Sequence, residues 1–276
     1  MISPSRTPGA ATGSGGGPGW GHGLLEEWRS LTRLGAFILI TLATAARRYG
    51  DSSQVMRPQV LGEIHRSGVR LLPIVGFLGV VLGMVFVGQT VVLMEQFGGG
   101  PFTGTLMVTV FLREMAPMIA GLLVLARVGT AAVVELGTAR ALGEVEALEV
   151  LGIDPIHYLV VPRVVGFSAA VVSLTAYLIL ISLGSGYAFA YARGLKAPPL
   201  EFLGQIAGAM SALDFPLLIL KTLLFGAFTG WVICYQGLAR PMTLGEVGPA
   251  TTRTVAVCVV GCLMLDALFI GVYLLL

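Results

Sequence analysis

Two adjacent ionisable residues, Arg113 and Glu114, lie inside a long apolar stretch of this sequence. About ten residues of helix, or roughly 15 Å, separate them from its start. A charge at that depth in a bilayer is costly and usually faces protein or water. One interpretation is structural: both residues pair with neighbours and hold a helix that Pro117 kinks. The other is functional: Arg113 contacts a phosphate of a ligand and Glu114 orients the same group.

Two further charges, Lys221 and Asp266, lie in later apolar stretches. They can neutralise one another if they lie at the same depth, which the sequence does not establish, and Lys221 can instead extend to the interface. We interpret both as structural. The alternative is that these two residues, with Arg113 and Glu114, form the pathway of an ion-coupled secondary transporter. Many such transporters contain internal repeats, and none is evident in this sequence.

A charged, helix-forming insert occupies residues 135–163, between two apolar stretches. Four apolar residues recur on one helical face of it: Ala141, Val145, Leu148 and Leu151. Glu146 and Glu149 point away from this strip, and Glu144 lies at its edge. Gly152 is placed to end the helix, Asp154 to cap the next one, and Pro155 to occupy the first turn of that next helix.

Two interpretations of this insert stay open. A charged loop in a membrane protein is commonly a solvated connector. A flexible connector, however, needs neither helix-forming residues nor caps at both ends. The second interpretation is a docking helix for a soluble partner, whose contact residues are Glu144, Val145, Glu146, Leu148, Glu149 and Asp154.

Several kinds of chemistry have no sequence signature here. There is no GxxxxGK[ST] loop, so any ATP must be bound and hydrolysed by a partner. No GxSxG or HExxH motif is present, so no catalytic residue is predicted. The three cysteines lie in apolar runs without metal-ligand spacing, and no metal or other cofactor is predicted. A net charge of +2, spread along the chain, does not suggest a nucleic-acid partner.

The elements that position these residues are membrane-spanning helices. The chain is 55% hydrophobic and 12% charged with a mean hydropathy of +0.88, whereas soluble domains carry about 25% charged residues. A spanning helix needs about 20 apolar residues. Five segments qualify and define a transmembrane domain over residues 71–276: residues 71–94, 102–136, 164–192, 215–236 and 254–276. We therefore expect an all-α integral membrane fold.

The part before residue 71 has a different composition. Residues 1–23 are rich in Gly, Ser and Pro and are expected to form a flexible tail. Residues 24–70 are expected to form interfacial helices. The apolar run at 34–46 is too short to span and should lie in the membrane surface, and a polar helix should follow over residues 54–65.

Most of the 17 Lys and Arg residues precede residue 71 or flank the insert and the last connection. Cytoplasmic segments carry an excess of Lys and Arg, so the N-terminus and the insert are expected in the cytoplasm. Five spans then place the C-terminus on the opposite side.

The ordered motifs resemble one family. They are LREMAP at 112–117, ARVGT at 126–130, ELG at 135–137, GIDP at 152–155 and VPR at 161–163, with GM at 83–84, GQ at 88–89, ATTRT at 250–254 and LD at 265–266. Together they resemble the Mla-type permease subunits of MCE lipid-transport ABC systems. The resemblance extends from about residue 55 to the C-terminus.

This resemblance implies a function and a set of partners. In the family, two permease copies pair in the inner membrane, and each docks a cytoplasmic ATPase through a coupling helix between spans two and three. The matching stretch here is 138–151. A ring of MCE-domain proteins lies outside, and lipid passes between it and a cavity between the permeases. Candidate cavity residues are Arg113, Glu114, Gly83 and Gln89. A third possibility is a scaffold for other membrane proteins.

Overall fold

The computed structural model describes residues 35–41, 43, 53–99, 102–194, 198–238 and 244–275. These residues form helices joined by turns, and no strand occurs among them. Five helical segments are long and apolar enough to cross a membrane: Arg57–Gln96, Thr103–Ala141, Ile156–Ala192, Asp214–Leu238 and Val247–Leu275. The predicted all-α membrane fold with about five spans is confirmed. The predicted tail at 1–23 lies outside the described residues, and of the predicted interfacial run at 34–46 only part is described.

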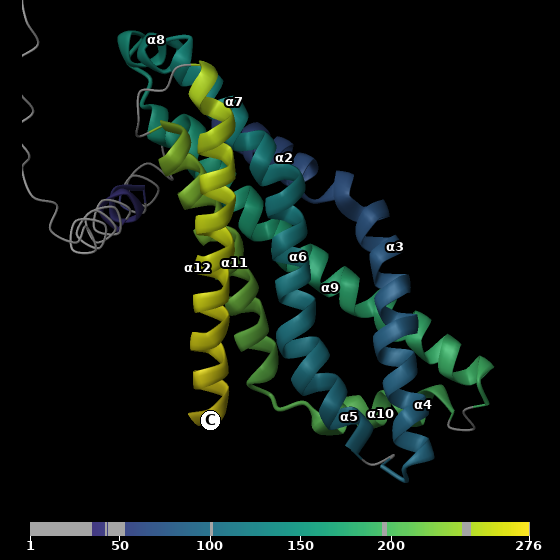
Figure 1. The fold of residues 1–276 in the computed structure, drawn as a ribbon. Helices are drawn as coiled ribbons and strands as arrows, with labels where there is room; N and C mark the ends of the chain where they lie inside the picture. The colour runs from purple at the N-terminus through teal and green to yellow at the C-terminus, as the bar shows by residue number, and fades with distance from the viewer. Residues whose placement is uncertain are drawn as a thin grey trace, which may run out of the picture.

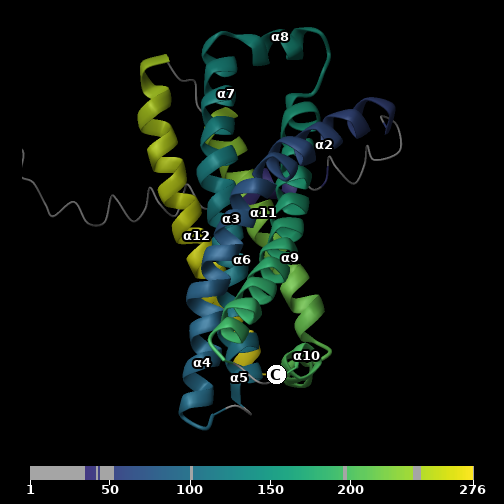
Figure 2. The same ribbon diagram turned by 90° about the vertical axis from the view of Figure 1, so that its right-hand side faces the viewer.

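The first span is built from several helical pieces. They are α2 (Ser53–Ser67), the short 3-10 turn η1 (Val69–Leu71), α3 (Leu72–Leu82), the π-helical η2 (Gly83–Gly88) and α4 (Gln89–Gln96). Helix α2 covers the polar helix predicted at 54–65. It lies across one end of the bundle, whereas α3 and α4 run along it (Figure 2). The membrane-spanning part therefore begins near Leu71, where α2 gives way to α3.

The second span combines α and π turns. It comprises α5 (Thr103–Leu106), η4 (Met107–Met115), α6 (Ala116–Val124), η5 (Leu125–Gly129) and α7 (Thr130–Ala141), of which η4 and η5 are π-helical. The wide turns of η4 end at Met115, two residues before Pro117. Proline has no N–H to donate and crowds the carbonyl four residues earlier. The irregularity predicted at Pro117 thus takes the form of π-helical turns, which are frequent at functional sites.

The remaining elements complete the bundle. They are α8 (Glu144–Val150), η6 (Ile156–Val160), α9 (Val161–Ala192), α10 (Pro199–Ala209), α11 (Asp214–Leu238), η7 (Leu244–Glu246) and α12 (Val247–Leu275). Figure 1 shows α8 at one end of the bundle, with α4, α5, α10 and the C-terminal end of α12 at the other. The insert and the C-terminal helix end therefore face opposite sides of any membrane that the bundle spans.

Helix α9 packs along η2 at very short range. A Cβ at Gly83 would overlap the Ser182 carbonyl and the Ser185 hydroxyl. One turn away, Ser182 Oγ donates to the Gly79 carbonyl at 3.0 Å. Gly79 and Gly83 thus allow α9 to approach closely, and the contact includes an interhelical hydrogen bond from a serine.

Candidate functional site

Lys221, on α11, lies at the centre of a charged cluster inside the bundle. Its side chain has 0% exposure. Its Nζ donates to Glu114 Oε2 at 2.7 Å and to the Arg113 carbonyl oxygen at 2.8 Å. The same Nζ lies 2.8 Å from Asp266 Oδ1, an ion pair that lacks hydrogen-bond geometry. Lys221 and Asp266 therefore do meet at one depth, and they share the contact with Glu114.

Pro117 accounts for one of these contacts. In a regular α-helix, residue 117 donates its N–H to the carbonyl of residue 113, and proline cannot. The Arg113 carbonyl oxygen is met by Lys221 Nζ instead. Because a buried backbone acceptor needs a partner, a side chain from span four satisfies the acceptor that the proline leaves open.

Arg113 itself bonds to the start of α11. Its Nη2 lies 2.8 Å from Asp214 Oδ1 and donates to Asp214 Oδ2 at 2.9 Å. Its guanidinium also lies 4.8 Å from the ring centre of Tyr273, a cation–π distance. Asp214 accepts a second bond, from the Ser211 N–H at 2.7 Å. Sequence reasoning missed Asp214, although a carboxylate directly before the span predicted at 215–236 was a signal for it.

This first cluster joins spans two, four and five through two cations and three carboxylates. Such an arrangement supports the structural interpretation of Arg113, Glu114, Lys221 and Asp266. Exposure is uneven, however: the side chains of Arg113 and Glu114 are 23% and 26% exposed, whereas Lys221 is fully buried. The Arg113–Glu114 edge is therefore the most accessible part of the cluster, ahead of Asp266 at 14%, and it is the edge that the functional interpretation needs.

A second cluster lies nearer α8 and joins α2, α7 and α9. Arg163 Nη2 lies 2.6 Å from Glu135 Oε1, and Arg66 Nη1 lies 2.8 Å from Glu135 Oε2. Glu63 completes the group: its Oε1 lies 3.2 Å from Arg66 Nη2 and 3.9 Å from Arg163 Nε. Sequence reasoning did not predict this network. Its signal was that Glu135 and Arg163 mark the two ends of the insert, which meet in space.

The predicted docking helix is interrupted at Gly143. This residue has φ +76°, a left-handed conformation that ends α7 and starts α8 at Glu144. Ala141 therefore belongs to α7, and the expected single helix over 138–151 is wrong. The side chain of Arg140 on α7 extends across the break, and its Nη1 lies 3.0 Å from Glu146 Oε1 on α8.

The end of α8 follows the prediction. Gly152 has φ +76° and its N–H donates to the Glu149 carbonyl at 3.0 Å. The next N–H, of Ile153, donates to the Leu148 carbonyl at 2.9 Å, which completes a Schellman motif. Asp154 Oδ1 then accepts from the Ile156 N–H at 3.0 Å and caps the following helix. Both predicted caps are confirmed.

The exposed face of α8 differs from the one expected. Glu144, Glu146 and Glu149 are exposed, as predicted. Val145, expected on the contact surface, is only 3% exposed and packs inward, and Leu148 is half-buried. The restart of the helix at Gly143 sets a different register. The apolar side chains that α8 offers to a partner are instead those near its end, with Val150 88% and Leu151 72% exposed.

Two residues of the first span were expected at a lipid cavity. Gln89 is exposed on α4, where a ligand can reach it. Gly83 is buried against α9, so its place in the structure is a helix contact and not a cavity wall.

Among the described residues, no group of three or more His, Cys, Asp or Glu side chains is placed to hold a metal ion. Cys234, Cys258 and Cys262 are free and buried. Cys262 Sγ lies 3.8 Å from the Thr229 hydroxyl, a contact between two helices of the bundle.

Comparison with known proteins identifies relatives of this architecture. The chain is 28% identical over 207 residues to the chloroplastic protein Trigalactosyldiacylglycerol 1 of Arabidopsis thaliana, covering 75% of this chain and 59% of that protein, which is less than two thirds of it. It is 27% identical over 202 residues to a probable ABC transporter permease protein of Synechocystis, covering 73% and 76%. It is 27% identical over 201 residues to the intermembrane phospholipid transport system permease protein of Haemophilus influenzae, covering 72% and 76%.

The family model "Permease MlaE" matches residues 60–272, a range that contains both charged clusters, the capped helix α8 and all but the first three residues of span one and the last three of span five. On that match the chain belongs to the MlaE permease family.

Proposed function

We propose that this chain is the membrane-spanning subunit of an ATP-driven phospholipid transporter, and that α8 receives a separate ATPase subunit. The observation that carries the proposal is α8 itself. It is a short helix with an acidic, exposed face, it is capped at its end, and it directly connects spans two and three. The name of the Haemophilus relative supports phospholipid as the cargo.

The base of α8 suits the transmission of force. The ion pair between Glu135 Oε1 on α7 and Arg163 Nη2 on α9, at 2.6 Å, links the helices on either side of α8. Arg66 on α2 pairs with the same carboxylate. ATP-driven movement of a subunit bound to α8 therefore acts on three helices together. Movement of α7 and α9 changes the shape of the space beside span one, which is where we place the lipid.

The exposed edge of the first cluster suits a lipid headgroup. Arg113 and Glu114 keep about a quarter of their side-chain surface accessible, more than the other members of the cluster do. A guanidinium is the preferred protein group for a phosphate. We place Arg113, Glu114 and Gln89 at the lipid cavity and assign Gly83 to helix packing.

The assembly needs further partners. We propose that a second copy of the chain pairs with this one to enclose the cavity and that an MCE-domain protein exchanges lipid at the end opposite α8. We place α8 and the N-terminus in the cytoplasm, the C-terminus on the other side, and the whole chain in the inner membrane, since basic residues flank the insert.

The ion-coupled alternative has less support. Lys221, the most buried charge in the described spans, is fully enclosed and held by Glu114, Asp266 and the Arg113 carbonyl. An ion pathway needs groups that water or the ion can reach.

The test uses the chain with its ATPase and MCE-domain partners in lipid nanodiscs. Glu144→Lys with Glu149→Lys reverses two exposed charges of α8 that have no ion-pair partner among the described residues. We expect ATPase binding to weaken at least tenfold, with a parallel loss of ATP-dependent transfer of fluorescent phospholipid. Glu95→Lys, an exposed glutamate at the other end of the bundle, is the matched control. Unchanged ATPase binding and transfer in the double variant, or transfer driven by a proton gradient without ATP, would contradict the proposal.

A further inference from the structure

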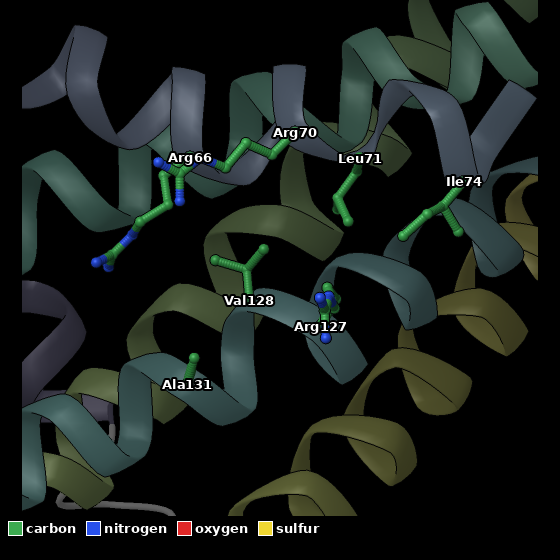
Figure 3. A pocket seen from close by; sticks show the side chains of 7 residues that line it. All are labelled: Arg66, Arg70, Leu71, Ile74, Arg127, Val128 and Ala131. Atoms are coloured by element: carbon green, nitrogen blue, oxygen red, sulfur yellow. The ribbon is translucent and has the colours of Figure 1, made fainter.

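A cavity of about 540 Å³ lies between the first and second spans, apart from the cluster around Lys221. Its lining comes from two sides: Arg66, Arg70, Leu71 and Ile74 from α2, η1 and α3, and Arg127, Val128 and Ala131 from η5 and α7. Figure 3 shows the side chains of the two groups across the space between the helices. Three of these lining residues are arginines, and none is acidic.

The three arginines differ in how they are neutralised. Arg66 is paired with Glu63 and Glu135, and Arg163 completes that network, so two cations and two carboxylates balance. Arg70 and Arg127 are exposed, and no acidic group among the described residues lies within ion-pairing distance of either. The cavity therefore holds two positive charges that the described part of the chain does not compensate.

Arg127 makes this excess charge significant. It lies in η5, within a segment of 39 residues that is long and apolar enough to cross a membrane. An arginine inside such a segment normally faces a partner charge or water, because an isolated charge is costly in lipid. An anion in the cavity would supply the partner charge that the described residues do not provide.

The other walls indicate what kind of anion fits. Leu71, Ile74, Val128 and Ala131 are apolar, so one part of the cavity suits hydrocarbon while the arginines suit phosphate. The cavity is lined by residues around the turn from α2 into α3, and Figure 1 shows that turn at the end of α3 nearer α8, which suits a headgroup at the membrane surface on that side. A free phosphate uses only the arginines, whereas a phospholipid uses both kinds of wall.

We propose that this cavity binds the phosphate of an anionic phospholipid from the leaflet on the α8 side, with Arg70 and Arg127 as its ligands. Arg66 completes the basic wall and is held in place by Glu63 and Glu135. This inference rests on the proposed function only in taking lipid as the cargo. It adds a preference for anionic headgroups and a second contact site, distinct from the Arg113–Glu114 edge.

The test measures lipid retained by the full chain, purified from nanodiscs that contain equal amounts of phosphatidylglycerol and phosphatidylcholine, by native mass spectrometry. We expect selective retention of phosphatidylglycerol. Each charge-assisted contact contributes about tenfold to binding, so Arg70→Gln with Arg127→Gln should lower retention by about a hundredfold. Arg57→Gln, an exposed arginine of α2 outside the cavity lining, is the matched control and should retain the lipid. Arg127→Lys keeps the charge and should restore part of the binding, which separates binding from misfolding.

Several outcomes would overturn the inference. One is equal retention of both lipids, or equal retention by the double variant and the Arg57→Gln control. A second is displacement of phosphatidylglycerol by millimolar inorganic phosphate, which would identify a free anion as the ligand. A third is loss of the two-copy assembly in the double variant, which would identify a protein contact. If selective retention holds but the assembled transporter moves no lipid with ATP, the proposed function fails and the cavity assignment stands.

Discussion

Lys221→Met tests whether one buried ammonium holds spans two, four and five together. The substitution keeps a side chain of similar length but removes the cation that Glu114 and Asp266 share and the donor to the Arg113 carbonyl. Removing one partner of a buried ion pair costs about 3–5 kcal/mol. Because Lys221 is fully buried and serves three acceptors, we expect the upper end of this range, about 5 kcal/mol of unfolding free energy.

The assay is thermal unfolding of the chain in nanodiscs of one composition. With about 2–4 °C per kcal/mol for a chain of this size, Tm should fall by roughly 10–20 °C. Leu220→Met on the same helix, where Leu220 is 48% exposed, is the matched control and should shift Tm by about 1 °C or less. Adding Glu114→Gln and Asp266→Asn to Lys221→Met removes the orphaned charges and should recover more than half of the loss. A Lys221→Met variant as stable as the Leu220→Met control would refute the reasoning.

Two further substitutions test the helix contacts. Gly83→Ala places a methyl group against the backbone of α9 at Ser182, and we expect a loss of about 1–3 kcal/mol of unfolding free energy, measured as a fall in Tm. Arg163→Met removes the buried cation of the second cluster and leaves Glu135 and Glu63 with Arg66, and we expect a loss of about 2 kcal/mol together with weaker coupling of ATP hydrolysis to lipid transfer.

Each of these substitutions has a control on α9 or at the end of α9. Gly184→Ala adds a methyl group that meets nothing within 4 Å and should leave Tm unchanged. Arg193→Met removes an exposed arginine at the other end of α9 and should affect neither stability nor coupling. If Gly83→Ala matches Gly184→Ala, or Arg163→Met matches Arg193→Met, the corresponding contact does not stabilise the bundle.

The parts of the structure that depend on local sequence were predictable. Spans follow from the length of apolar runs, and the caps at Gly152 and Asp154 follow from residue types that suit only a few backbone positions. The orientation of Val145 was not predictable from periodicity, because Gly143 interrupts the helix and resets the face on which later residues lie. If apolar residues are assigned to one helical face across a break that the sequence does not reveal, those beyond the break are placed on the wrong face of the helix.

Charge pairing was less predictable because it depends on depth and on neighbouring helices. Lys221 and Asp266 could be suggested as partners, but the position of each along its own span is set by packing. The Arg113–Asp214 pair joins residues that are 101 positions apart, and no periodicity relates them. The cavity beside Arg127 depends in the same way on the turn between α2 and α3, which local sequence does not specify.

The π-helical turns of the second span have a consequence for changes in chain length. In an α-helix, inserting or deleting one residue rotates everything beyond it by about 100°, because a turn contains 3.6 residues. A π turn contains an additional residue and can absorb a deletion by becoming an α turn. Within this span, η4 and η5 flank the regular α6, which faces Phe225 through Gly121. Single-residue insertions or deletions can therefore occur within η4 or η5 while the helical faces before and after them keep their orientation.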